Sequence, residues 1–322
     1  MRIAVLGAGG IGGYFGGRLA GGGHQVSFLA RGAHLQAIRE NGLQVESVRG
    51  DFVVPDAVAT DDPGQVGPVD LVLLAVKTWQ LDDAIGLLPP LLGPHTAVLT
   101  TQNGVEAPDQ VAGVVGRPSV LPGIAKIFAM IAAPGRIRHG GGPASLSFAE
   151  WDDVPSARVE DLREAFTAAG IATPAPDGIW SELWAKFLFV VPLGGLGAAL
   201  DATVGELRDT PAHRQLLEDA MREIEAVARA NEVTLPTRVV PRTMAFVDQQ
   251  PAEATTSLQR DLLAGHPSEL DAWTGAVVRL GAQADVPVPL HRLLMAVLTA
   301  RYPDALPALS GLRAGKTDGP TS

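Results

Sequence analysis

The chain of 322 residues contains no cysteine. This absence excludes disulfide bonds, thiolate nucleophiles and cysteine-ligated metal or iron–sulfur centres. The seven histidines are scattered, and no grouping of His, Asp and Glu has the spacing of a metal site, so we expect no metal. A chain without cysteine also fits the reducing cytoplasm, which is the location we predict.

Clusters of Lys and Arg are missing as well. The chain carries 25 basic against 35 acidic residues, a formal net charge of −10. Nucleic acids and anionic membranes favour a basic face, so we expect neither as a partner. The expected partner is a small-molecule substrate. Apolar helical faces in the second half of the chain leave both a monomer and a homodimer open.

Long uninterrupted hydrophobic runs are also lacking. Glycines between positions 7 and 17 break the first apolar segment, which does not fit the apolar core of a signal peptide. The stretch 183–200 is strongly apolar, but Lys186, Pro192 and Gly194 interrupt it. Between these breaks it is too short to span a bilayer, and we predict a buried helix there.

The first half of the chain has the alternating pattern of an α/β fold. Short apolar runs predict buried parallel strands at 3–6, 25–30, 69–76 and 96–100. A helix is predicted at 11–20, between the first two strands. Strands that alternate with helices predict a doubly wound, mostly parallel sheet. The segment 119–148 predicts a β extension of this domain, and 171–176 an edge strand.

From Asp177 onward the pattern becomes helical. Asp177 is the predicted N-cap of a helix that carries Trp180, Leu183, Trp184 and Phe187 at helical spacing. Further helices are predicted at 211–231, 268–284 and 290–299. The expected organisation is a Rossmann domain over 1–176, an all-α domain over 177–310 and a disordered tail over 311–322.

The first strand runs into the motif Gly7-Ala8-Gly9-Gly10-Ile11-Gly12. Gly7 permits a tight turn, Gly9 lets the backbone approach a pyrophosphate, and Gly12 lets the following helix pack close to the strand. The N–H groups of that helix start favour a bound diphosphate. The position between a strand and a helix predicts a dinucleotide site, against the alternative of a glycine-rich turn without a ligand.

The end of the second strand indicates which nicotinamide cofactor is bound. NAD enzymes usually place Asp or Glu there for the ribose hydroxyls, whereas this chain has Ala30-Arg31-Gly32. The Arg31 guanidinium can pair with a 2′-phosphate and stack on adenine, which favours NADPH. The alternative is that Arg31 is a solvated surface residue.

In the order and spacing of its motifs, nearly the whole chain resembles the ketopantoate reductases (2-dehydropantoate 2-reductases). Besides the glycine motif and Arg31, the matching segments are Val76-Lys77-Thr78 with Gln80, Thr101 to Glu106, Pro134-Gly135 to His139, Leu183 to Lys186, Ser257 to Asp261 and Gly265 to Asp271. The resemblance implies a Rossmann domain, a helical domain of the 6-phosphogluconate-dehydrogenase-like type, and a substrate and nicotinamide that meet between them. The implied reaction is the NADPH-dependent reduction of 2-dehydropantoate to pantoate, a step of pantothenate biosynthesis.

The resemblance also assigns roles to single residues. Lys186 matches the catalytic lysine, and an apolar helix around it would lower its pKa and make it a general acid; the alternative is a lysine that snorkels to solvent. Asn103 would border both nicotinamide and substrate, and Lys77 would contact the cofactor. Ser257 would donate to the substrate carboxylate. Glu269 would orient Lys186 or bind the substrate, unless it is only a helix-start carboxylate; His139 is expected to be structural.

One pair of positions departs from the family pattern. The family carries asparagines four and eight residues after the catalytic lysine, where they reach the distal hydroxyl of the substrate; here these positions are Val190 and Gly194. An apolar site does not select for a hydroxyl. The sequence therefore leaves three functions open: reduction of 2-dehydropantoate, reduction of a 2-oxo acid with a smaller or more apolar distal group, and a non-catalytic NADPH-binding regulatory role.

Overall fold

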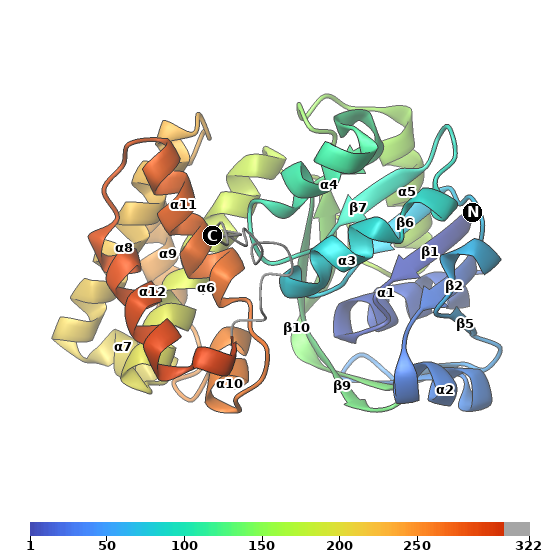
Figure 1. The fold of residues 1–322 in the computed structure, drawn as a ribbon, viewed down its shortest axis with the longest axis horizontal. Coiled ribbons are helices and arrows are strands. Elements are labelled where there is room, and N and C mark those ends of the chain that lie inside the picture. Colours follow the sequence, from blue (N-terminus) through green and yellow to red (C-terminus); the bar gives the residue numbers. More distant parts are fainter. Residues whose placement is uncertain (306–322) are drawn as a thin grey trace, which may run out of the picture.

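The computed structural model of the chain describes residues 1–305, so the predicted tail and the predicted end of the second domain lie outside the described residues. The N-terminal half forms an α/β lobe and the C-terminal half a helical lobe beside it (Figure 1). The strands are β1 (Arg2–Leu6), β2 (Gln25–Leu29), β3 (Leu43–Ser47), β4 (Phe52–Val54), β5 (Val58–Thr60), β6 (Leu71–Leu74), β7 (Ala97–Thr100), β8 (Val120–Leu121), β9 (Gly123–Ala133) and β10 (Arg136–Phe148). The α-helices are α1 (Gly10–Gly21), α2 (Gly32–Asn41), α3 (Leu81–Gly86), α4 (Ala107–Val115), α5 (Ala157–Ala168), α6 (Ile179–Leu200), α7 (Val204–Asp209), α8 (Pro211–Ala230), α9 (Val239–Val247), α10 (Ser257–Leu263), α11 (Ala276–Gln283) and α12 (Pro289–Arg301).

The main sheet is parallel and has six strands in the order β5-β2-β1-β6-β7-β8. Neighbouring residues of β1 bury on opposite faces: Ile3 and Val5 join the core under α1, α2 and α5, while Ala4 and Leu6 join the core under α3 and α4. Because both faces are covered, the strands read as continuous apolar runs. The α/β fold class predicted from the sequence is confirmed.

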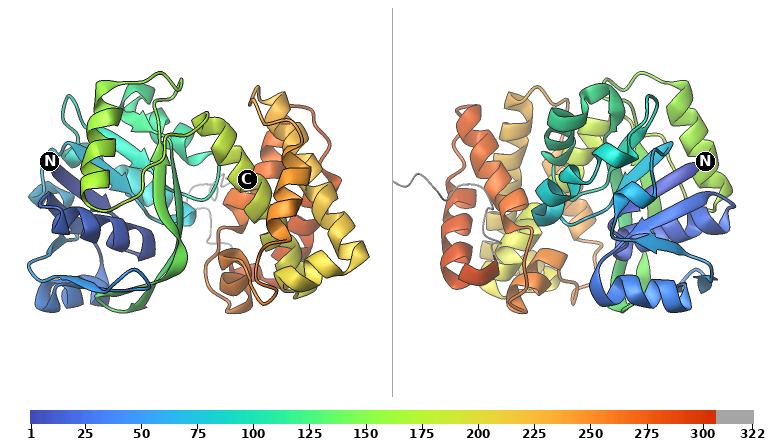
Figure 2. Two further views of the ribbon diagram at one scale, coloured as in Figure 1. Left: turned by 180° about the vertical axis from the view of Figure 1, so that it is seen from behind. Right: turned by 45° about the vertical axis from the view of Figure 1, so that its right-hand side comes forward.

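A second sheet, in the order β4-β3-β10-β9, packs on the outer side of α1. Seen from behind, its long strands β9 and β10 stand at the side of the α/β lobe that faces the helical lobe (Figure 2). The predicted β extension is thereby confirmed. The predicted edge strand at 171–176 is wrong: only Ala172 forms a bridge, to Ser145, and the prolines at 174 and 176 leave the segment irregular.

The long helix α6 is the centre of the helical lobe and packs against α8, α9, α10 and α12. It is long and apolar enough to cross a membrane, but 67% of its apolar window is buried inside the protein, which confirms the predicted buried helix. The helix continues through Pro192, which lies in its interior. The predicted N-cap is wrong: Gly178 holds that position, and the Asp153 carboxylate accepts the N–H of Ile179 (2.7 Å).

The segment predicted as a helix over 268–284 divides into two parts. Residues Asp271–Gly275 form one π-helical turn, and α11 follows directly. A π-helical turn is often found at a functional site, because the wider turn re-aims the side chains around it. This one faces α6 and carries the fully buried Trp273.

Glu223 of α8 caps the start of α12, whose own N-cap residue provides no side-chain hydrogen bond. Its carboxylate accepts the backbone N–H of Leu290 (2.8 Å) and of His291 (3.0 Å) and the ring Nδ1 of His291 (2.6 Å). Burial raises the pKa of Glu223, but these hydrogen bonds outweigh it and hold the pKa below its ordinary value. The stability that Glu223 contributes is therefore present at neutral pH and lost as the pH falls through that lowered pKa.

Replacing Glu223 with Ala is expected to lower the free energy of unfolding by about 2–3 kcal/mol, because it leaves buried donors without an acceptor. Glu225→Ala on the same helix is the matched control: Glu225 pairs only with Arg229 at i+4 (2.8 Å), an arrangement worth a few tenths of a kcal/mol. Urea denaturation of both variants at pH 7 measures the difference. Equal costs for the two variants would contradict the capping role.

Candidate active site

The glycine motif follows β1 at the carboxyl edge of the parallel sheet. Three of its positions suit glycine, each for a different structural reason. Gly7 has φ +101°, a conformation that favours glycine. A Cβ at Gly12 would lie 2.1 Å from the carbonyl oxygen of Gly7, so only glycine lets α1 approach the turn. A Cβ at Gly9 would meet nothing within 4 Å, which leaves its backbone open to a ligand.

The start of α1 fits the diphosphate of a dinucleotide. No side chain caps this helix, and no acidic residue lies in its first turn, so no side chain of the helix start competes with an anion for the N–H groups of Gly10 and Ile11. Gly10 also lies against β9, where a Cβ would be 2.3 Å from the carbonyl oxygen of Ala129. Arg31 lies just past β2, at the same sheet edge, with an exposed side chain.

Lys186 of α6 reaches from the helical lobe to the α/β lobe. Its Nζ donates to Oδ1 of Asn103 (2.6 Å) and to the carbonyl oxygen of Ala125 (2.7 Å). An ammonium group has three protons to donate, so one remains for a third acceptor. A neutral amine keeps two, which match these two protein acceptors. Lys186 can therefore give up one proton and keep both of its anchoring hydrogen bonds.

The surroundings of Lys186 favour the loss of that proton. Burial lowers its pKa from the ordinary value of 10.5 to about 8. The Glu269 carboxylate opposes this effect, and the positive charge of Lys126 adds to it. A lysine with this pKa is mainly protonated at neutral pH and is a competent general acid there.

Lys77 follows β6 and contacts two carboxylates of the helical lobe. Its Nζ lies 3.3 Å from Oδ2 of Asp261 and 3.4 Å from Oε2 of Glu269. Burial lowers the pKa of Lys77, but the two carboxylates outweigh it and raise that pKa above its ordinary value. Lys77 therefore stays charged and holds the two lobes together at this end of the junction.

Glu269 is buried, with 4% of its surface exposed. Its Oε1 accepts the backbone N–H of Thr78 (3.2 Å), and its Oε2 pairs with Lys77. The contacts of Glu269 include no hydrogen bond to Lys186, but its charge raises the pKa of that lysine. That Glu269 orients Lys186 or binds the substrate stays a prediction. Thr78 and Lys77 belong to the other lobe, so Glu269 is more than a carboxylate at a helix start.

The remaining predicted residues lie on α6 and α10. Ser257 is the half-buried first residue of α10, after the capping residue Thr256. Val190 and Gly194 follow Lys186 at one-turn intervals along α6. Val190 is half-buried, while Gly194 is buried against Trp273 and Leu258.

Comparison with known proteins places this chain in a family. The family model described as ketopantoate reductase PanE/ApbA matches residues 3–153, and the model for its C-terminal domain matches residues 178–302. The chain belongs to the ketopantoate reductase family. A 2-dehydropantoate 2-reductase from Mesorhizobium japonicum is 32% identical over 92% of this chain and 97% of its own length. The protein is an oxidoreductase that acts on CH–OH groups.

Two solved structures show the same fold. A PanE/ApbA family ketopantoate reductase from Ralstonia eutropha has a TM-score of 0.87 at 32% identity and covers 95% of this chain and 99% of its own. A D-mandelate dehydrogenase solved with NADH has a TM-score of 0.83 at 25% identity and covers 95% of this chain and 100% of its own.

Several residues at the lobe junction of this ketopantoate reductase family member had no predicted role. Asp261 pairs with Lys77, Arg279 pairs with Glu106 (2.7 Å), and Nε1 of Trp273 donates to the carbonyl oxygen of Asn103 (2.9 Å). Each contact joins residues that are 170 or more positions apart, and no local pattern predicts such a pairing. His139 lies elsewhere: it is buried and bonded to Ser47 (2.8 Å) and Gly141 (2.9 Å), as a structural residue would be.

A hollow lies at the lobe junction, and Lys186 is not among its lining residues. It has a volume of about 1230 Å³, and its lining includes Trp151, Trp180, Trp184, Arg117 and Arg242.

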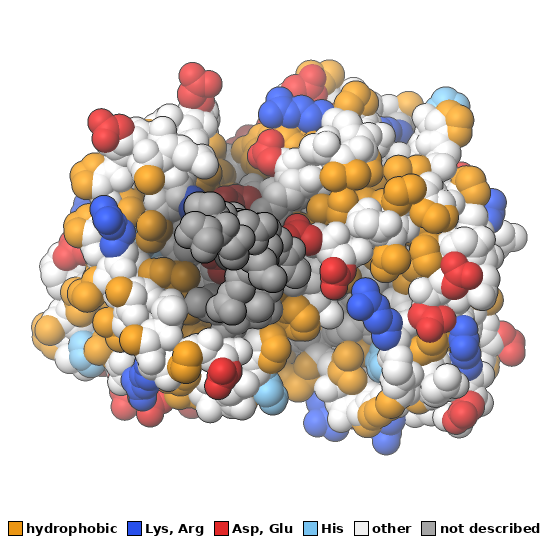
Figure 3. All heavy atoms as spheres, viewed as in Figure 1, with side chains coloured by type: hydrophobic (Ala, Val, Ile, Leu, Met, Phe, Trp, Pro, Cys, Tyr) orange, Lys and Arg blue, Asp and Glu red, His pale blue; other side chains and the backbone are white. Residues whose placement is uncertain are grey.

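On the face shown in Figure 3, Lys and Arg side chains are scattered among acidic and apolar ones. Among residues 1–305, no group of three or more His, Cys, Asp or Glu is placed to hold a metal ion.

Proposed function

We propose that the protein uses NADPH to reduce a 2-oxo acid to a 2-hydroxy acid. The observation that carries this proposal is Lys186, a lysine with a lowered pKa and a proton to spare beside Asn103. A regulatory protein that only binds NADPH has no need of such a group. The retention of Lys186, Ser257 and Glu269 together argues for catalysis.

The site residues divide the work of the reduction. NADPH, when bound, supplies the hydride that the carbonyl carbon of the substrate accepts. Lys186 donates its third proton to the carbonyl oxygen, which becomes the hydroxyl. Because Oδ1 of Asn103 accepts from Lys186, its amide NH₂ is left to donate to the substrate. The Ser257 hydroxyl would bind the carboxylate.

The cofactor would lie along the carboxyl edge of the main sheet. Gly7, Gly9, Gly10, Ile11 and Gly12 would cradle the diphosphate, and Arg31 would bind the 2′-phosphate. Lys77 and Asn103 would border the nicotinamide end. The D-mandelate dehydrogenase with NADH shows that this fold also takes the other cofactor, so NADH belongs in every assay.

The walls of the site accept an apolar distal group on the substrate. Val190 and Gly194 offer no hydrogen bond to a distal hydroxyl, and an apolar wall discriminates weakly for or against one. The D-mandelate dehydrogenase, named for a 2-hydroxy acid with an aryl group, supports this substrate class. The second candidate is reduction of 2-dehydropantoate to pantoate in pantothenate biosynthesis, which the name of the Mesorhizobium japonicum relative supports.

An NADPH-oxidation assay with a panel of 2-oxo acids tests the proposal. The panel contains 2-dehydropantoate, its analogue without the hydroxyl, and phenylglyoxylate, each with NADH as a control. We expect turnover with kcat/KM for the two hydroxyl-free acids within about tenfold of that for 2-dehydropantoate, or above it. A preference for 2-dehydropantoate above about a hundredfold would establish the second candidate instead. No NADPH consumption with any acid would favour the regulatory role.

The pH dependence of the reduction should follow Lys186. The protonated form is the proton donor, so kcat/KM for reduction should be level below about pH 8 and fall tenfold per unit above it. Lys126→Met removes a nearby positive charge, raises the pKa of Lys186 and should move the midpoint to higher pH. Arg117→Met, which removes a charge that is not among the causes of this shift, should leave the midpoint in place. A midpoint that Lys126→Met does not move would contradict the assignment.

We further propose the border between the two domains at residues 176 and 177. The family models leave 154–177 unmatched, and the irregular segment before α6 lies within that gap. A cytoplasmic location remains the proposal that the absence of cysteine supports. Both a monomer and a homodimer are compatible with this proposal.

A further inference from the structure

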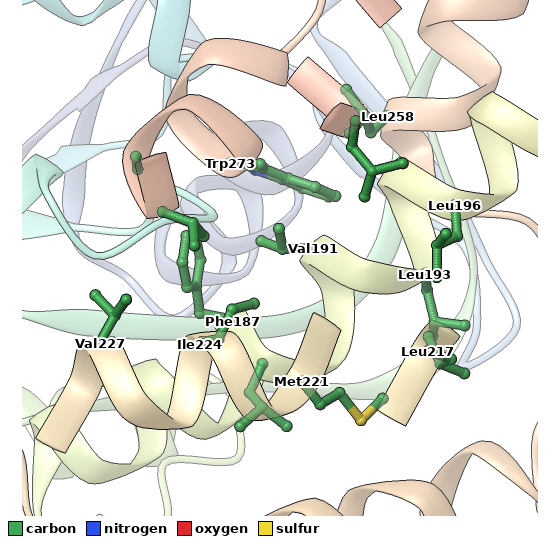
Figure 4. Close-up of a cluster of buried hydrophobic side chains, with 14 of the residues drawn as sticks. Phe187, Val191, Leu193, Leu196, Leu217, Met221, Ile224, Val227, Leu258 and Trp273 are labelled. Carbon is green, nitrogen blue, oxygen red and sulfur yellow. The ribbon is translucent and has the colours of Figure 1, made fainter. Parts of the chain in front are cut away.

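The buried Trp273 connects two parts of the site that are far apart in the sequence. Its indole extends from the π-helical turn toward Leu258 (Figure 4). Its Nε1 donates to the carbonyl oxygen of Asn103 (2.9 Å). The side-chain oxygen of Asn103 in turn accepts a hydrogen bond from Nζ of Lys186 (2.6 Å). Only 1% of Trp273 is exposed. The indole is therefore held both by packing and by a directed hydrogen bond.

The far edge of the same indole fills the space beside Gly194. A Cβ on Gly194 would lie 3.0 Å from Cζ3 of Trp273 and 3.1 Å from Cδ2 of Leu258, which is tighter than ordinary contact. A longer side chain at 194 would have to displace the indole. Displacement of the indole would also strain the hydrogen bond to Asn103.

We propose that Trp273 is a specificity-determining and positioning residue of this enzyme. Its indole occupies the space that a side chain at position 194 would need, which favours glycine there and leaves α6 without a polar group two turns beyond Lys186. It also fixes the backbone of Asn103, whose side chain orients Lys186. This inference rests on the proposed reduction of a 2-oxo acid. It adds Trp273 as the residue that favours glycine at position 194 in the apolar wall of the site.

A double-mutant cycle of Gly194→Asn and Trp273→Leu tests the packing. In the wild-type background, Gly194→Asn should lower the melting temperature and kcat, because the amide collides with the indole. In the Trp273→Leu background the same change should cost less, because the space is open. This thermal measurement needs no substrate. Equal costs in the two backgrounds would overturn the proposal whatever the activity of the enzyme.

The same variants test specificity. The double variant has room for an amide at 194, so its kcat/KM ratio of 2-dehydropantoate to the hydroxyl-free analogue should rise at least tenfold over wild type. Neither single variant should show this rise. A double variant with the wild-type ratio would overturn the role of Trp273. A wild-type preference for 2-dehydropantoate above about a hundredfold would instead refute the proposed substrate class, while the thermal cycle still reports on the indole.

Trp273→Phe tests the positioning role, since it keeps an aromatic ring and removes the N–H. Its kcat should fall about tenfold with little change in the KM for the cofactor, because the carbonyl of Asn103 loses its donor. The midpoint of the pH profile should move as the acceptor of Lys186 loosens. Trp180→Phe is the matched control: its Nε1 also donates to a backbone carbonyl at 2.9 Å, that of Trp151, away from Lys186. Identical pH midpoints in wild type and Trp273→Phe would show a purely structural tryptophan.

Discussion

Lys186→Met should lower kcat for 2-oxo acid reduction by about 10³-fold, within the usual contribution of general acid catalysis. Methionine keeps most of the length and apolar volume of the side chain but has no proton to donate. Asn103 and Ala125 lose the donor that they share, so part of the effect comes from a displaced amide. Steady-state kinetics at pH 7 with saturating NADPH measures the loss.

Lys186→Arg separates charge from proton transfer. Arginine stays positive and can donate to both acceptors, but it does not give up a proton at any pH where the protein is folded. We expect kcat to remain as low as in Lys186→Met. The dissociation constant for NADPH should match wild type in both variants, which shows that the dinucleotide site is intact. Wild-type kcat in Lys186→Arg would show that only a positive charge is needed and would refute the role of proton donor.

The parts of the fold that follow from local sequence were predictable. The glycine motif requires only that the backbone between β1 and α1 turns sharply and packs closely, and the structure places Gly7 and Gly12 in those conditions. The apolar runs gave the strands because a parallel sheet covered on both faces excludes polar residues. These features depend on residues within about ten positions of one another.

Features that depend on distant contacts were not predictable. Pro192 lies inside α6, where the buried packing around the helix outweighs the hydrogen bond that proline removes, and no local rule predicts that balance. The cap of α6 comes from Asp153, 26 residues before the N–H that it accepts. The partners of Lys77 and Asn103 lie 192 and 170 residues away in Glu269 and Trp273. Only the folded chain brings these groups together, and they hold the lobes at the site.

Arg31→Ala should weaken NADPH binding by about 10- to 100-fold and leave NADH binding nearly unchanged. The guanidinium lies at the end of β2, where the ribose of a dinucleotide on the glycine loop would lie, and a charge-assisted fork to a 2′-phosphate is worth about 1.5–3 kcal/mol. NADH has no 2′-phosphate, so it loses only the stacking of the guanidinium on adenine. Fluorescence titration of both cofactors at one fixed ionic strength measures the two dissociation constants.

Arg49→Ala is the matched control, since Arg49 is an exposed arginine of the same lobe and its removal changes the net charge by the same amount. If Arg31 acts only through the general field of the protein, the two variants should weaken NADPH binding equally, and added salt should reduce both effects. If Arg31 binds the 2′-phosphate directly, the ratio of NADPH to NADH affinity should fall in Arg31→Ala alone. A proportional loss of both cofactors in Arg31→Ala would identify a residue that supports the loop without selecting between them, and the preference for NADPH would then need another origin.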